Sequence, residues 1–174
     1  MIPALDPETH RLPFSAPDAP IVASLEEVAE RFVASAPGRP RRERIWDAFM
    51  LWKDLADEAL PGSTFWLSGS FLTDRERPSD LDVVAVLEPH HTSELRPLVT
   101  DRVRVLLTHL NLLAEQPAGL APRLQPVGGL IDGFACYGWV PENVSWWQDA
   151  WSTEYDKTTH EPTGVRMGYV EVTP

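Results

Sequence analysis

The sequence predicts an α/β (α+β) fold, in which a small mixed β-sheet is flanked by helices. Two segments with helical spacing of apolar residues come first, and short β-branched or aromatic segments then alternate with further helices. The chain has 174 residues, of which 43% are apolar. This composition predicts one domain with a hydrophobic core and excludes wholesale disorder.

Residues 1–23 are predicted to form a proline-rich N-terminal arm, followed by one folded domain over residues 24–174. Five prolines stand in the arm, and proline has no backbone N–H to contribute to a regular hydrogen-bonding pattern. We therefore expect an extended segment there and no packed element.

Two helices are expected to open the domain. A capping box formed by Ser24 and Glu27 predicts the start of the first helix, which ends at Pro37. A longer helix is predicted from Pro40, which suits the first turn of a helix, to Pro61. The apolar positions of this longer helix predict a buried stripe of Ile45, Phe49, Trp52, Leu55, Ala56 and Ala59.

The rest of the chain is expected to alternate strands, loops and helices. The clearest strand is residues 81–87, which contain three valines and follow a polar loop over residues 69–79. Further strands are predicted over residues 65–67, 130–139 and 166–172. Helices are predicted over residues 92–114 and 145–155, and prolines mark a loop between residues 117 and 126.

The composition predicts a cytoplasmic protein that neither enters a membrane nor binds long duplex DNA. No apolar segment approaches the roughly 20 residues needed to span a bilayer, and the first residues lack the pattern of a signal peptide. A net charge of −11 disfavours sequence-independent binding to DNA phosphates. The single cysteine, Cys136, excludes an intramolecular disulfide and a cysteine-rich zinc site. A small anionic ligand held through a metal stays compatible with this charge.

The segment from residue 67 to residue 84 contains the residues that are candidates for binding a phosphate and a metal ion. Gly69 and Ser70 directly follow a predicted strand, where a glycine lets the backbone approach a ligand and a hydroxyl with N–H groups can hold phosphate oxygens. Asp80 and Asp82 stand two residues apart at the start of the next strand, so their carboxylates share one face. Such a pair suits Mg²⁺ or Mn²⁺. Taken singly, each pair also fits an ordinary turn.

The combination of these pairs resembles the signature of the DNA polymerase beta-like nucleotidyltransferase superfamily. Gly69 and Ser70 are followed by nine residues, then by Asp80-Leu81-Asp82 and an apolar strand. The sequence Gly-Ser-Phe-Leu-Thr-Asp-x-x-x-Pro-Ser-Asp-Leu-Asp is similar to the corresponding segment of small standalone bacterial and phage-borne members of that superfamily. Only the segment from Gly69 to Asp82 carries the motif, although the resemblance extends over most of the chain.

The superfamily resemblance implies a third carboxylate on a neighbouring strand. Asp132 meets this condition because it lies in an apolar segment, where a charge is costly unless it is paired or metal-bound. Its alternative is a strand-edge aspartate that faces solvent, and Asp101 is a second candidate on a predicted helix.

The resemblance further implies a nucleotidyltransferase-like fold and a metal-dependent transfer of a nucleoside monophosphate with release of pyrophosphate. Asp80, Asp82 and Asp132 would be catalytic and would hold Mg²⁺ or Mn²⁺. The residues expected to contact the nucleoside triphosphate are Gly69, Ser70, Thr73, Arg75 and Arg77. The two arginines equally fit solvated loop charges. The acceptor stays open between a protein side chain, an RNA 3′ end and a small molecule.

Two other readings of the sequence stay open, and one of them is an interaction domain that uses its tryptophan-rich tail, which predicts a large exposed aromatic patch. The chain fits a catalytically inactive member that binds a nucleotide or a protein, for example as a toxin–antitoxin or phage-defence component. A tryptophan-rich segment around Trp146, Trp147 and Trp151 fits core packing better than base stacking, for which Tyr137 and Trp139 are the better candidates. A cluster of arginines at residues 39–44 is expected to pair with local acids such as Glu43 or to bind an anion.

Overall fold

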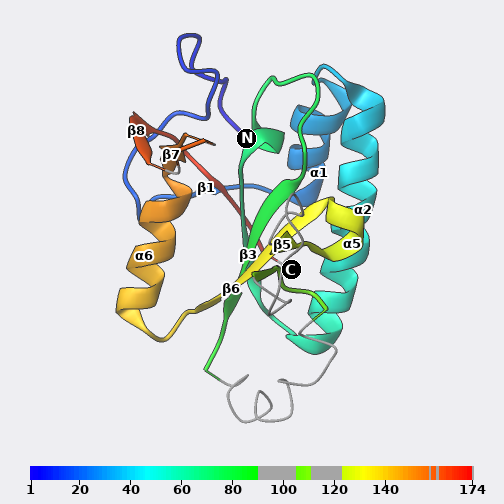
Figure 1. The fold of residues 1–174 in the computed structure, drawn as a ribbon, viewed down its shortest axis with the longest axis vertical. Helices are drawn as coiled ribbons and strands as arrows, with labels where there is room; N and C mark the ends of the chain where they lie inside the picture. The colour runs from blue at the N-terminus through cyan, green and yellow to red at the C-terminus, as the bar shows by residue number, and fades with distance from the viewer. Residues whose placement is uncertain (90–104, 111–122, 157, 160, 174) are drawn as a thin grey trace.

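The centre of the molecule is a five-stranded mixed sheet with the strand order β1-β9-β2-β3-β6 (Figure 1). The computed structural model describes residues 1–89, 105–110, 123–156, 158–159 and 161–173. In sheet order, the strands comprise Ile21–Val22 (β1), Val170–Val172 (β9), Thr64–Ser68 (β2), Leu81–Leu87 (β3) and Ile131–Tyr137 (β6). Two pairs of short strands lie outside this sheet: β4 (His109–Leu110) with β5 (Arg123–Leu124), and β7 (Thr153–Tyr155) with β8 (Pro162–Arg166).

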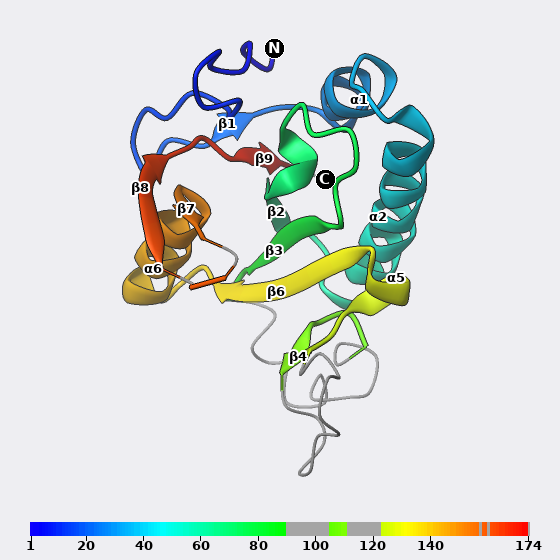
Figure 2. The ribbon, with the colours of Figure 1, turned by 45° about the horizontal axis from the view of Figure 1, so that its top comes forward.

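Helices flank the sheet on both sides, which confirms the predicted α/β (α+β) class (Figures 1 and 2). One side carries α1 (Leu25–Ala29), which continues as a π-helical segment over Glu30–Ala34, and the long helix α2 (Arg39–Ala59). The other side carries α6 (Pro141–Trp151) with the β7–β8 hairpin. Two short helical segments, Ser70–Leu72 and α5 (Pro126–Gly129), precede β3 and β6.

The two faces of β3 separate the core into two clusters. Residues at alternate positions of a strand point to opposite faces. Leu81 and Val83 belong to the larger cluster, which packs under α2, whereas Val84 and Val86 pack with the aromatic side chains of α6. Asp82 is two residues before Val84, so its carboxylate lies on the same α6 side of the sheet.

The predicted start of the first two helices is confirmed. Ser24 caps α1, and its hydroxyl and the Glu27 carboxylate each accept a backbone N–H of the other residue. Pro40 lies in the first turn of α2. The predicted buried stripe of α2 holds for Ile45, Phe49, Trp52 and Ala56, and Ala59 is half-buried. The prediction is wrong for Leu55, which is 44% exposed.

The N-terminal arm is packed, so the expectation of an unpacked segment is wrong. Ile2 and Leu12 are buried in the larger core cluster, and β1 at the end of the arm pairs in parallel with β9. The Leu12 carbonyl accepts the Gly168 N–H at 2.9 Å, and the Tyr169 hydroxyl donates to the Pro17 carbonyl at 3.0 Å. Prolines withhold N–H donors, but their carbonyls and the apolar residues between them still anchor the arm.

Three predicted elements differ from the structure. Most of the predicted helix over residues 92–114, including Asp101, lies outside the described residues, and residues 105–110 form a turn and β4 instead of helix. The helix predicted from residue 145 begins at Pro141, whose missing N–H suits a first helical position, and ends at Trp151. The single strand predicted over residues 166–172 is divided into β8 and β9, because residues 167 and 168 donate their N–H groups elsewhere.

Within the described residues, no helix has both the length and the apolar character required to cross a membrane.

Candidate functional site

The fold brings the three predicted aspartates to one cavity. In the parallel pair of β3 and β6, the register places Asp82 beside Asp132, so both carboxylates lie on the α6 side of the sheet. Neighbouring strands are about 4.8 Å apart, which makes these two acids immediate neighbours. Asp80, which precedes β3, lines the same cavity of about 530 Å³. Asp82 and Asp132 are far apart in sequence and meet only through this strand pairing.

Neutral hydrogen-bond donors orient two of these carboxylates. The Thr108 hydroxyl donates to Asp132 Oδ1 at 2.7 Å, and the same hydroxyl oxygen accepts the Gly133 N–H at 3.1 Å. The Gln125 side-chain amide donates to Asp80 Oδ2 at 2.7 Å, and the Ser79 hydroxyl donates to Asp80 Oδ1 at 2.6 Å. Sequence reasoning missed Thr108 and Gln125, since each lies in an irregular segment with no motif around it.

Gly69 lets the Asp82 carboxylate lie directly against the backbone of the preceding loop. Its backbone angles, φ 83° and ψ −165°, fall in a region that is essentially restricted to glycine. A Cβ atom at this position would stand 1.6 Å from Asp82 Oδ2. The glycine is therefore required both by the conformation of the turn and by the position of the neighbouring acid.

Ser70 offers a hydroxyl to this cavity. Ser70 lines the cavity beside Gly69 and the three aspartates. Its Oγ atom is shielded from solvent and has no hydrogen-bond partner among the described residues. A buried hydroxyl without a partner is costly, and a ligand oxygen reached by rotation of this side chain would remove that cost.

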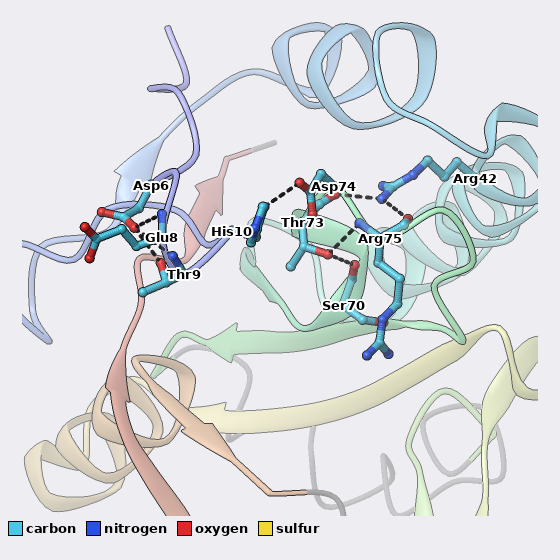
Figure 3. A network of polar contacts seen from close by, with 9 residues as sticks. All are labelled: Asp6, Glu8, Thr9, His10, Arg42, Ser70, Thr73, Asp74 and Arg75. Atoms are coloured by element: carbon cyan, nitrogen blue, oxygen red, sulfur yellow. Dashed lines mark hydrogen bonds and ion pairs between the residues drawn. The ribbon is translucent and has the colours of Figure 1, made fainter.

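Arg42 holds the loop that follows Ser70 (Figure 3). The side chain is fully buried, and this burial lowers the pKa of its guanidinium. The negative charge of Asp74 has the opposite effect and raises that pKa, but by less. An arginine has five N–H donors, and here all of them are used on carbonyl oxygens. The acceptors are the carbonyls of Pro37 at 2.8 Å, Phe32 at 3.0 Å, Phe71 at 2.6 Å, Thr73 at 2.6 Å and Arg75 at 2.7 Å.

The neighbouring Arg41 holds the other end of the loop. It donates to the carbonyls of Pro78, at 3.1 Å, and Ser79. In the predicted arginine cluster, Arg39 pairs with Glu43 at 2.7 Å as expected. Arg41 and Arg42 differ from the expectation, because among the described residues their hydrogen bonds go to backbone carbonyls. The cluster thus sets the path of the chain between the Gly69 turn and Asp80.

The other predicted nucleotide-binding residues have unequal positions. Arg75 lines the cavity, and Figure 3 shows its side chain leaving the polar network in the direction of β3. Thr73 is 3% exposed and acts inside the loop, where its hydroxyl donates to the Ser70 carbonyl at 2.7 Å and accepts the Arg75 N–H at 3.1 Å. Arg77 is exposed and does not line the cavity.

A second wall of the cavity comes from the arm and the β7–β8 hairpin. Arg11 of the arm forms an ion pair with Glu154 of β7, and both residues line the cavity. Tyr155, Asp156 and Met167 complete this wall. The sequence carries no signal for these residues, because they meet the aspartates only after the arm folds back onto the sheet.

Part of the tryptophan-rich segment belongs to the hydrophobic core. Trp151 is buried and lines the cavity with Phe134, whereas Trp146 is 61% exposed. Trp147 contacts the rings of Phe134 and Trp151, with centroids 5.2 and 4.9 Å apart. Tyr137 and Trp139, the stacking candidates from sequence, do not line the cavity and pack against one another, with centroids 5.3 Å apart.

The donor set fits a hard divalent cation. Asp82 and Asp132 are carboxylates at adjacent register positions, and carboxylates this close repel unless a cation or a proton intervenes. Oxygen donors of this kind are the ligands that Mg²⁺ takes together with substrate phosphates. In the part of the chain that the structure describes, no three His, Cys, Asp or Glu side chains already form a metal-holding group.

A family model matches most of the chain. A family described as being of unknown function, DUF6932, matches residues 6–173. The matched range begins in the N-terminal arm and includes every residue that lines the cavity. No curated protein and no solved structure matches the chain.

Proposed function

We propose that this chain, which belongs to the DUF6932 family, is a metal-dependent nucleotidyltransferase. The observation that carries the proposal is the pairing of Asp82 with Asp132 on the face where Gly69 and Ser70 line the same cavity. Two acids next to a glycine–serine turn combine metal ligands with phosphate-binding groups. The resemblance of the segment from Gly69 to Asp82 to the DNA polymerase beta-like superfamily supports the same reaction class.

The reaction is a displacement at the α-phosphorus of a nucleoside triphosphate. The acceptor hydroxyl oxygen forms a bond to this phosphorus, the bond from the α-phosphorus to the oxygen that bridges to the β-phosphate breaks, and pyrophosphate leaves. Asp80, Asp82 and Asp132 would hold Mg²⁺ or Mn²⁺, which supplies charge neutralisation at the phosphates when bound.

Side chains of the cavity also orient the phosphates and receive the proton. The Ser70 hydroxyl and the Arg75 guanidinium donate to phosphate oxygens, and the Asp132 carboxylate accepts the proton of the acceptor hydroxyl. Thr73 acts by shaping the loop between Ser70 and Arg75. The acceptor belongs to one of three classes: a protein side chain, an RNA 3′ end or a small molecule. We place the reaction in the cytoplasm, where a lone thiol such as Cys136 stays reduced.

Incubation with each nucleoside triphosphate, labelled at the α-phosphate, tests the proposal. The wild-type protein with Mg²⁺ or Mn²⁺, alone and with cell extract, is expected to transfer the label, and the double variant Asp80→Asn/Asp82→Asn to lose all transfer. Asp47 and Asp54 are exposed acids of α2 outside the cavity, so Asp47→Asn/Asp54→Asn is the charge-matched control. Unchanged transfer in the first double variant contradicts the proposal, and nucleotide binding without any turnover favours the inactive, ligand-binding alternative.

Removal of the Thr108 hydroxyl is expected to weaken metal binding. Replacing a group that hydrogen-bonds a metal ligand typically costs about 10- to 100-fold in metal affinity or activity. Thr108→Val should therefore raise the Mg²⁺ concentration for half-maximal transfer by about 10- to 100-fold, while Thr108→Ser, which keeps the donor to Asp132, stays near wild type. A titration of transfer rate against Mg²⁺ measures this, and identical curves for Thr108→Val and wild type would count against the assigned role.

A further inference from the structure

Tyr155 is an exposed aromatic residue at the second wall of the cavity. The residue is 45% exposed and lines the cavity with Glu154. Among the described residues its ring has no aromatic or cationic partner, whereas Phe134 and Trp151, which line the same cavity, pack edge to face with centroids 5.8 Å apart. Tyr155 therefore has a ring surface that is available to a ligand.

The pairing of β7 with β8 is irregular next to Tyr155. Thr153 pairs with Arg166 and Tyr155 pairs with Pro162, so β8 has two more residues than β7 between the pairs. The additional residues of β8 include Gly164, with φ 85°. Bulges of this kind redirect side chains and occur next to functional sites.

Polar contacts hold the backbone on both sides of Tyr155. The Glu154 carboxylate pairs with Arg11 and accepts from the Thr163 hydroxyl at 3.1 Å. The Asp156 N–H donates to the Glu161 carbonyl at 2.9 Å. The strand that carries Tyr155 is thus fixed at both neighbouring residues, while Tyr155 itself is exposed.

We propose that Tyr155 is the stacking surface for the base of the nucleoside triphosphate. This inference rests on the proposed function, since it assigns the nucleoside half of the ligand whose phosphates Ser70 and Arg75 bind. A phenol ring offers every base the same surface, so recognition by stacking tolerates different bases. Purines present the larger ring area, and we expect them to bind a few-fold more tightly than pyrimidines.

Tyr137 provides a matched control for this role. It is 48% exposed, nearly the same as Tyr155, and also lies at the end of a strand. Its ring packs against Trp139, and it does not line the cavity. Removal of Tyr137 therefore tests the loss of a half-exposed tyrosine without the loss of a cavity surface.

Calorimetric titration with a non-hydrolysable α,β-methylene analogue of ATP and with inorganic tripolyphosphate, each with Mg²⁺, tests the inference. Stacking on one ring changes affinity by roughly 5- to 150-fold. Tyr155→Ala should lose this factor for the ATP analogue and keep wild-type affinity for tripolyphosphate, whereas Tyr155→Phe and Tyr137→Ala should bind both as wild type does. Thermal unfolding of each variant shows that the fold is retained.

The outcomes separate this inference from the proposed function. If wild type binds the ATP analogue and Tyr155→Ala binds it equally well, the stacking role is overturned while the proposed function stands. Equal weakening of the ATP analogue and of tripolyphosphate also overturns stacking, because the loss then concerns the phosphates. If binding of the analogue depends on Tyr155 but no nucleotide is ever transferred, the stacking role stands and the transferase proposal fails. No binding by wild type overturns both.

Discussion

Arg42→Met is expected to lower the free energy of unfolding by about 3–5 kcal/mol. Methionine fills much of the same space but leaves five buried or half-buried carbonyl oxygens without their donor. Each buried polar group left without a partner costs about 1–3 kcal/mol, and relaxation of the loop recovers part of the sum. Urea unfolding of the variant and wild type measures the difference.

Two further substitutions make this result specific. Arg42→Lys keeps the charge but has three donors without the planar fork, so it should recover only part of the lost stability. Arg39→Met removes an exposed arginine from the first turn of the same helix, where the single pair with Glu43 contributes about 1 kcal/mol or less. A loss for Arg42→Met no larger than that for Arg39→Met would show that the carbonyl contacts do not organise the loop.

Gly69→Ala is expected to abolish transfer and to destabilise the fold by about 3 kcal/mol or more. A residue other than glycine at φ 83° and ψ −165° is strained, and the new methyl group would also stand 1.6 Å from Asp82 Oδ2. Either the turn or the carboxylate must move, and both belong to the proposed site. Unfolding curves and the label-transfer assay report the two effects separately.

A comparison with a second glycine separates backbone strain from the collision. Gly62 has φ 82°, and a Cβ atom there meets nothing within 4 Å, so Gly62→Ala reports strain at positive φ alone. In an Asp82→Ala background the collision partner is absent, and Gly69→Ala should there cost about 1–3 kcal/mol less than in wild type. Equal costs in the two backgrounds would show that the carboxylate does not press on the turn.

The parts of the fold that local sequence specifies were the predictable ones. The capping box at Ser24 and the strand of residues 81–87 each depend on side chains within a few residues of one another, and both are confirmed. Gly69, Ser70 and Asp80 were recognisable because they lie in one short motif. Asp132 was recognisable as a charge inside an apolar strand, although its register with Asp82 is visible only in the fold.

The missed features depend on contacts between distant segments. Arg11 reaches the cavity because the arm is anchored by Leu12 and by β1, and proline content alone cannot show such anchoring. Thr108 becomes a partner of Asp132 through tertiary packing beside β6. Leu55 has an apolar side chain on the helix yet meets no covering segment in the described structure and stays exposed. Tertiary context decides each of these cases, and no periodicity in the sequence encodes it.

Arg41 and Arg42 hold the loop after Ser70 through its main-chain carbonyls. Every residue type supplies a backbone carbonyl oxygen, so these contacts of the Arg42 guanidinium depend on the path of the main chain and not on the side chains of the loop. The exposed side chains of Glu76 and Arg77 can therefore be exchanged, by evolution or by design, without altering the path of the chain between Ser70 and Asp80. A protein built in this way can change what it recognises at the rim while the spacing of its acidic groups stays constant.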